Sequence, residues 1–579
     1  MLRRLAAGLL LPCSLAMSAP AAAKPSLTPA QSSDDQAQHM RGTANAQAAA
    51  NADQASLRKA AKDMEGVVAY LDSPAVRQQA LGYFPLYVRN LDVKRDLAGI
   101  YARLGRKDDA LAMLESTLNY AWLPGTGKML ESDPAFASLR GDARYQALLK
   151  TEELPARLWQ GPAAEVPYRE RLTVEQRIAG LSMFWAEARS YFVHFDHVPD
   201  LDWNQVYLDY LPKVMAAETT ADYYRVLMQL APLLQDGHTN IYPPQELAKR
   251  FYARPPLRTL LVDGKVLVER VDSKRLAGRV HPGEEIVSID GLPVQRYAEE
   301  RVAPFASSST PQDRLVRMYG YQLLTGAADA PVKLGLRDAA GRAHEESVAR
   351  SGYDDIAAPP AFAFRMLPGG VAYFALDHLE SDAGPKAFKA VLPQIMQARA
   401  LVIDVRGNGG GSTEFGDQIL AYLTKSPISH AMSLRRDNDA GFRQGDRSPI
   451  VWAPPFDFPS GEAAHAEVFT GKVAVLTGPR TFSAGEDFVL AFDALHRGVT
   501  VGETTGGSTG QPLMFRLPGG GTARICAKLD LLPDGTPFVG RGLKPDIEAH
   551  ASVQSIRSGA DPVLDRALQA LGGGELAGR

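Results

Sequence analysis

The last third of the sequence alternates strand-like and helix-like segments, and this alternation limits the fold more than any other feature. Apolar runs such as "GGVAYFALD", "ALVIDVRG" and "KVAVLTG" are separated by segments with apolar residues at helical spacing, such as "GPKAFKAVLPQIMQAR" and "TEFGDQILAYLTK". Strands that alternate with helices are typical of βαβ units, whose sheets are mostly buried. We therefore predict an α/β domain at 355–575.

The other segments predict a multidomain chain, because 579 residues are too many for a single core. The stretch "KRDLAGIYARLGRKDDALAMLESTLNYAW" predicts two helices broken at Gly105 and resembles a tetratricopeptide hairpin. The stretch "RLAGRVHPGEEIVSIDGLPV" resembles part of a PDZ domain, a β-rich fold. The predicted order is a signal peptide at 1–23, a flexible linker at 24–60, a tetratricopeptide-like helical module at 61–155, a helical domain at 165–250, a PDZ-like domain at 253–350, and the α/β domain.

The N-terminus predicts export. Arg3 and Arg4 precede an apolar run that is too short to span a bilayer, and the run ends in small residues suited to signal peptidase. We expect a periplasmic or secreted protein with no membrane span after cleavage. Cleavage would remove Cys13 and leave Cys526 alone, so no intrachain disulfide is expected.

Composition and motifs argue against several classes of function. The net charge of −3 gives no electrostatic reason to expect nucleic-acid binding. The sequence contains no HExxH, CxxC or Walker motif, and the loop Gly407 to Gly411 is followed by Ser412 and Thr413 instead of the Lys-Ser/Thr pair of a Walker loop. We predict no metal and no cofactor.

Ser483, in "PRTFSAGEDF", lies where a strand is predicted to turn into a helix. A serine held there is exposed beside the N–H groups of the first helical turn, which stabilise negative charge on a carbonyl oxygen. This arrangement suits acyl transfer. The alternative is that Ser483 or Thr481 only caps the helix, with Glu486 at the capping-box spacing from Ser483.

His238, in "QDGHTNIY", follows a helical segment and a glycine, so its ring could point into a cleft. By itself one histidine of eleven predicts little. A nearby nucleophile would make it a candidate general base.

Five motifs occur in an order that carries a resemblance: "QDGHTNI", "LVIDVRGNGGGS", "TGPRTFSAGEDF", "GETTGGSTG" and "GRGLKPDI". Together they resemble the tail-specific protease and tricorn-core family of serine peptidases. The resemblance covers about 165–575 and implies a ClpP/crotonase-type catalytic domain. It implies Ser483 as nucleophile and the backbone of Gly410 and Ala484 as oxyanion donors.

The resemblance also bears on the base. Thr504 occupies the position of the lysine in the tail-specific branch, whereas His238 matches the histidine of the tricorn-like branch. That branch also has a serine and a glutamate where this sequence has Gly237 and Val539. Asp236, Glu486 or a backbone carbonyl could orient the ring instead, and the sequence does not choose among them. Three further groups could in principle reach the cleft: Lys528, Lys544 and His496.

These features predict an exported serine peptidase that acts on peptides or unfolded proteins, with Ser483 as nucleophile and His238 as general base. The alternative is a catalytically weak or inactive binding or scaffold protein of the same fold, because retinoid-binding repeats resemble this fold and bind apolar ligands. The sequence predicts neither the oligomeric state nor the cleavage specificity.

Overall fold

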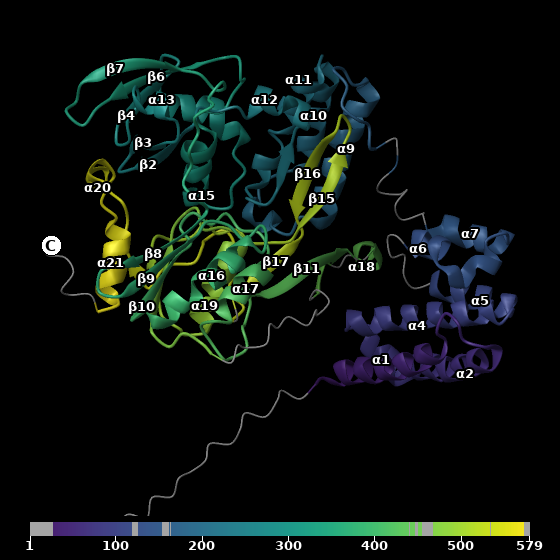
Figure 1. Cartoon of the computed structure of the whole chain (residues 1–579). Helices are drawn as coiled ribbons and strands as arrows, with labels where there is room; N and C mark the ends of the chain where they lie inside the picture. Colours follow the sequence, from purple (N-terminus) through teal and green to yellow (C-terminus); the bar gives the residue numbers. More distant parts are fainter. Residues whose placement is uncertain are drawn as a thin grey trace, which may run out of the picture. The chain divides into compact units, whose positions relative to one another are not determined.

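The computed structural model describes residues 27–118, 126–152, 161, 164–438, 440–445, 448, 450–453, 467–532 and 534–572. The chain divides into two compact units, and the boundary lies between Arg157 and Leu158. Figure 1 shows the elements of both units along the chain. The predicted signal peptide at 1–23 lies outside the described residues.

The first unit is helical, as predicted. Gly105 has φ 75°, a conformation that glycine adopts without strain, and it separates α4 from α5 at the predicted position. The helix pair therefore confirms the predicted break. The helices of this unit are α1 (Pro29–Gln47), α2 (Gln54–Leu71), α3 (Pro74–Ala80), α4 (Phe84–Arg103), α5 (Lys107–Leu118), α6 (Thr126–Ser132) and α7 (Ala143–Glu152).

The flexible linker predicted at 24–60 is wrong over its described part, because α1 and the start of α2 lie there. A capping box joins Thr28 and Gln31 at the start of α1. Arg41 then ion-pairs with Asp92 and Asp96 of α4, at 3.2 and 2.7 Å. The buried side of α1 consists of alanines and small polar residues, so the sequence shows no apolar period although the helix is packed.

The second unit begins with a helical block that does not form a core by itself. Its buried side chains share one core with the hairpin of β15 (Pro512–Leu517) and β16 (Gly521–Cys526), which Figure 1 shows beside α9. β16 pairs with β1 on one side and with β15 on the other. The remaining elements of the block are α9 (Val174–Tyr191), α10 (Trp203–Ala216), α11 (Thr220–Leu227), β1 (Asn240–Tyr242) and α12 (Ala248–Phe251).

The next block is rich in strands, as predicted for 253–350. Its sheet has the order β2-β3-β4-β6-β7, and every ladder in it is antiparallel. The strands are β2 (Leu257–Val262), β3 (Lys265–Val271), β4 (Glu285–Ile289), β5 (Leu292–Pro293), β6 (Val332–Arg337) and β7 (Ala343–Val348). The helices are α13 (Lys274–Ala277), α14 (Val294–Tyr297) and α15 (Pro311–Leu315).

The last block is the predicted α/β domain. Its sheet has the order β18-β14-β13-β10-β9-β8, and only β8 runs antiparallel to its neighbour. One face packs on α16, α17 and α19, and the other on α21. The bounds are β8 (Phe362–Leu367), β9 (Val371–Leu376), α16 (Ala383–Gln397), β10 (Ala400–Asp404), α17 (Thr413–Leu420), β13 (Lys472–Thr477), α19 (Ala484–Ala494), β14 (Val499–Gly502), β18 (Ile547–Glu548), α20 (Val553–Ser558) and α21 (Pro562–Ala570).

A small antiparallel sheet completes this block, with the order β12-β11-β17. Its elements are β11 (Met432–Asn438), α18 (Ala440–Gln444), β12 (Ile450–Ala453) and β17 (Lys528–Leu531). Among the helices that the structure describes, none combines the length and the apolar character needed to cross a membrane.

Candidate active site

Ser483 lies between the buried strand β13 and helix α19. Its backbone has φ 57° and ψ −128°, a conformation that residues other than glycine rarely adopt. Such strain persists where surrounding contacts enforce it, commonly at functional sites. The Ser483 hydroxyl makes no capping hydrogen bond. The Thr481 hydroxyl donates to the carbonyl of Val405 at 2.8 Å, so the alternative that either side chain caps α19 is wrong.

His238 contacts the Ser483 hydroxyl. Its Nε2 lies 2.9 Å from Ser483 Oγ, and its ring stacks on Phe482 with 4.8 Å between centroids. His238 follows α11 and precedes β1, which β16 holds in place. A Cβ atom on Gly237 would lie 2.8 Å from the Phe482 ring. A serine at position 237 would therefore displace the ring on which His238 stacks.

Ser508 is the group that orients His238. Its Oγ lies 2.8 Å from His238 Nδ1, and its side chain is fully buried. If Nδ1–H donates to Ser508, Nε2 carries the lone pair that can accept the proton of Ser483. This is the tautomer that a general base requires.

The Glu486 carboxylate accepts hydrogen bonds from the loop that contains Ser508. It accepts the N–H groups of Gly507 and Ser508, both at 2.8 Å, and the hydroxyl of Thr505. Glu486 therefore touches the backbone of the loop and not the histidine ring. Asp236 does not contact the ring either, because it accepts hydroxyls from Thr239 and Ser309.

Burial shifts both titratable groups toward their neutral forms. Removal from water lowers the pKa of His238 to about 3, so the ring is neutral in the neutral pH range. Burial also raises the pKa of Glu486 to about 7, although its hydrogen bonds with Thr505, Ser508 and Gly507 act in the opposite direction. His238 is thus neutral, so one ring nitrogen carries a free lone pair, while Glu486 can change charge near neutrality.

A cavity of about 430 Å³ opens over Ser483 and His238. Arg317, Arg480 and Arg524 line it, together with Glu380 and the glycines at 409–411. Two of these arginines are ion-paired, Arg317 with Asp313 at 2.9 Å and Arg480 with Glu269 at 2.8 Å. The cavity is therefore a polar cleft with the serine hydroxyl at its wall.

Comparisons with known proteins concern the fold that carries this site. The sequence model described as "Peptidase family S41" matches residues 370–549. These residues form an S41 peptidase domain. The S41 domain contains Ser483, Ser508 and Glu486, whereas His238 comes from the helical block outside the matched residues.

Individual relatives are distant. The chain is 24% identical over 398 residues to the Streptomyces coelicolor protein "Putative tricorn protease homolog 2", and this match covers 64% of the chain and 30% of the relative. The chain thus spans about a third of that relative's length. Two crystal structures of mature CPAF, one complexed with lactacystin, match with TM-scores of 0.53 at 15% and 16% identity. Each match covers 69% of this chain and 98% of the CPAF chain. At this identity the likeness shows the fold alone.

The predicted oxyanion donors of the S41 domain differ in their contacts. Gly410 lies against Ser483, because a Cβ atom there would be 2.6 Å from Ser483 Cβ. Its N–H, however, donates to Asn408 Oδ1 at 2.9 Å. The Ala484 N–H begins α19 and donates to none of the residues that the structure describes. Ala484 is therefore available as an oxyanion donor, and Gly410 becomes available only when Asn408 releases it.

Of the other candidate bases, Lys528 has a carboxylate partner of its own. Lys528 ion-pairs with Asp530 at 3.1 Å, and the His496 N–H closes the last turn of α19 on Asp493. Ligand atoms of His194, Asp236 and Cys526 lie within 4.8 Å of one another, all buried. These three side chains could hold a metal ion, although no metal-binding sequence motif links them. The predicted absence of a metal therefore remains a prediction.

Sequence reasoning missed Ser508. The available signal was a second serine between glycines in "TTGGSTGQ", a loop typical of close backbone approach. Only the fold shows that this loop lies against His238.

Proposed function

We propose that the chain is a serine peptidase that cleaves peptide bonds through an acyl-enzyme, with Ser483 as nucleophile and His238 as general base. The observation that carries the proposal is the buried chain of hydrogen bonds from Ser483 through His238 to Ser508. Residues in this order and geometry have the roles of nucleophile, base and orienting group. The S41 match supports peptides or unfolded proteins as the substrate class.

In the first step, Ser483 Oγ attacks the carbonyl carbon of the scissile bond while its proton moves to His238 Nε2. The carbonyl oxygen becomes an oxyanion, which the Ala484 N–H stabilises. The proton on Nε2 then passes to the leaving amine as the C–N bond breaks. Water, activated by the same nitrogen, hydrolyses the ester and restores the Ser483 hydroxyl.

Labelling with a fluorophosphonate tests this proposal, because only an activated serine reacts. We expect the wild-type chain to be labelled and to hydrolyse unfolded protein. Ser483→Ala should lose both properties while remaining folded, since removal of one small hydroxyl costs little packing. Ser412→Ala is the matched control, because Ser412 also begins a helix without a capping bond. Peptide hydrolysis by purified Ser483→Ala would refute the serine mechanism.

A second candidate is a weak or inactive binding protein of the same fold. The observation in its favour is the Gly410 N–H, which is donated to Asn408 and so not to a substrate oxyanion. A wild-type chain that binds unfolded protein but neither reacts with the fluorophosphonate nor hydrolyses peptides would favour this candidate.

Three finer features belong to the same proposal. The basic and apolar N-terminus supports export to the periplasm or beyond, and N-terminal sequencing of the exported chain should then begin at Lys24. The antiparallel sheet of 253–350 supports a PDZ-like domain, and the sheet of βαβ type supports a ClpP/crotonase-type catalytic domain. The helix pair α4 and α5 supports a tetratricopeptide-like module.

A further inference from the structure

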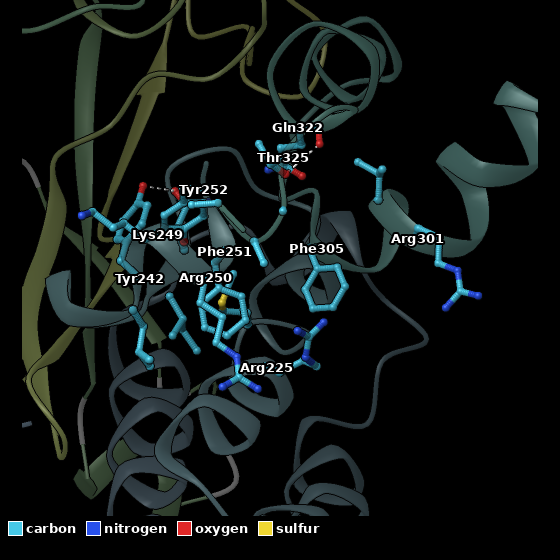
Figure 2. Close-up of a pocket in the computed structure, with 18 of the residues that line it drawn as sticks. Arg225, Tyr242, Lys249, Arg250, Phe251, Tyr252, Arg301, Phe305, Gln322 and Thr325 are labelled. Atoms are coloured by element: carbon cyan, nitrogen blue, oxygen red, sulfur yellow. Dashed lines mark hydrogen bonds between the residues drawn. The ribbon is translucent and has the colours of Figure 1, made fainter. Parts of the chain in front are cut away.

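A second and larger cavity lies in the same unit, with a volume of about 1000 Å³. It opens between the helical block and the strand-rich block, with walls from α11, β1, α12 and residues 297–329 (Figure 2). Its size is at the upper end of the range for ligand sites. The cavity is open enough for a chain segment instead of a single small ion.

Positive charge dominates this cavity. Arg225, Lys249, Arg250 and Arg301 line it, and none of the four forms an ion pair with a carboxylate in the described part of the chain. The carboxylates among the lining residues are Glu246 and Asp329. Asp222 interacts electrostatically with Arg225 and Arg250 but forms no ion pair with either in the described part of the chain. Both guanidinium groups therefore keep N–H donors that a bound carboxylate can accept.

Aromatic side chains lie among these cations. The Arg225 guanidinium sits over the Phe251 ring, 5.3 Å from its centroid, and Tyr252 is 43% exposed. In Figure 2 Arg225, Arg250, Phe251 and Phe305 lie around one space, whereas Arg301 lies apart and its guanidinium points away from them. Arginine and aromatic side chains are both enriched at protein–protein interfaces.

One residue connects this cavity with the nucleophile. Arg317 lines both the large cavity and the cleft over Ser483. Its guanidinium lies over the Phe482 ring at 4.9 Å, and Phe482 stacks on His238. Arg317 is thus a lining residue that the large cavity shares with the cleft.

We propose that the large cavity binds an acidic segment of a polypeptide, with carboxylates on Arg225 and Arg250 and apolar side chains against Phe251 and Phe305. In the proposed peptidase this segment belongs to the substrate and lies outside the scissile bond. That last point rests on the proposed function, whereas acidic-segment binding does not.

Binding is measured on the full chain with Ser483→Ala, so that no peptide is cleaved. The probe is a fluorescein-labelled peptide of alternating Glu and Phe, compared with its Gln and Phe counterpart by fluorescence anisotropy. We expect the Glu peptide to bind more tightly and its affinity to fall as salt is added. Arg225→Glu with Arg250→Glu should weaken binding of the Glu peptide by about tenfold or more.

Lys389→Glu with Arg566→Glu is the matched control, because both residues are exposed, lie on α16 and α21, and line neither cavity. This pair makes the same change in net charge and should leave the affinity unchanged. Equal affinities for the Glu and Gln peptides would overturn the proposal, and so would equal losses in the two double variants. Displacement of the Glu peptide by single-stranded oligonucleotide at lower concentrations than by unlabelled peptide would also overturn it, in favour of nucleic acid.

Hydrolysis separates this inference from the proposed function. With Ser483 intact, we expect a lower KM for an unfolded substrate with an acidic segment, and that advantage should disappear in Arg225→Glu with Arg250→Glu. Hydrolysis without an acidic preference would refute the inference and leave the peptidase. Acidic-peptide binding without any hydrolysis would refute the peptidase and leave the binding site.

Discussion

At the scale of single residues, the site depends on Ser508. Its hydroxyl lies at Nδ1 of His238, whereas the Ser483 hydroxyl lies at Nε2 of the same ring. A neutral hydroxyl cannot stabilise an imidazolium as a carboxylate does, but it can fix the tautomer. The carboxylate of Glu486 acts one step further away, on the backbone that carries Ser508. Ser508 therefore orients the ring of His238, and Glu486 supplies the negative charge nearby.

Ser508→Ala is expected to lower kcat by about 10²-fold, toward the lower end of the range for general acid–base catalysis, with little change in KM. The reason is that Ser508 acts through His238 only while the proton moves. Steady-state kinetics of Ser508→Ala, His238→Ala and the double variant test this. In the His238→Ala background, Ser508→Ala should have no further effect. Additive losses would show that Ser508 is only a packing residue.

The pH dependence should follow Glu486 and not His238. The pKa of His238 is near 3, so its titration lies below the working range. Glu486 has a pKa of about 7, and its deprotonated form accepts the loop N–H groups better, so kcat/KM should rise with pH through about 7. Glu486→Gln should remove this rise. A rise that persists in Glu486→Gln would assign the ionisation to another group.

The same shift affects stability with the opposite sign. The pKa of Glu486 is raised from 4.5 to about 7, so the folded state holds a proton that the unfolded chain releases between these values. Its contribution to the free energy of unfolding is therefore present below about pH 4.5 and lost as the pH rises through about 7. As the pH rises through about 7, kcat/KM is therefore expected to rise while the contribution of Glu486 to the free energy of unfolding is lost.

At the scale of elements, the hairpin β15–β16 ties the α/β domain to the helical block that carries His238. Tyr224 of α11 makes the connection, because its hydroxyl donates to the Pro518 carbonyl at 2.8 Å and accepts the Gly521 N–H at 2.9 Å. The hairpin turn thus depends on one buried hydroxyl. The position of β1, and with it His238, depends on β16.

Tyr224→Phe should lower the free energy of unfolding by about 1–3 kcal/mol, because it leaves a buried carbonyl and a buried N–H without their partner. Tyr223→Phe is a close control. The Tyr223 hydroxyl is equally buried and has no hydrogen-bond partner among the described residues, so its removal should be neutral or stabilising. Denaturant unfolding of both variants measures the difference. Equal losses would mean that the Tyr224 hydrogen bonds contribute nothing specific.

At the scale of the whole molecule, every side chain assigned to catalysis or to the large cavity belongs to the second unit. The first unit has its own core, with buried apolar residues from 37 to 148. Neither core contains a buried residue of the other unit. The chemistry should therefore not require the first unit.

A chain that begins at Leu158 should fold and keep the kcat/KM of the full chain toward a short peptide. The measurement compares both chains with the same peptide and checks folding by cooperative thermal unfolding. Ser483→Ala in the shortened chain supplies the background. A folded but inactive short chain would show that the helical unit contributes to catalysis.

The sequence by itself determined the strand and helix pattern and the break at Gly105, because periodicity and turn residues act within short segments. Ser483 as nucleophile came from the order of the five motifs and remains a prediction. It did not reveal α1, because α1 packs with alanine and ion pairs instead of an apolar stripe. Only the tertiary structure decided how the site is built. Ser483, His238 and Ser508 come from three segments, and 245 and 270 residues separate His238 from its two partners. Hydrogen-bond geometry at this separation depends on how β16 and α19 pack, which no local pattern encodes.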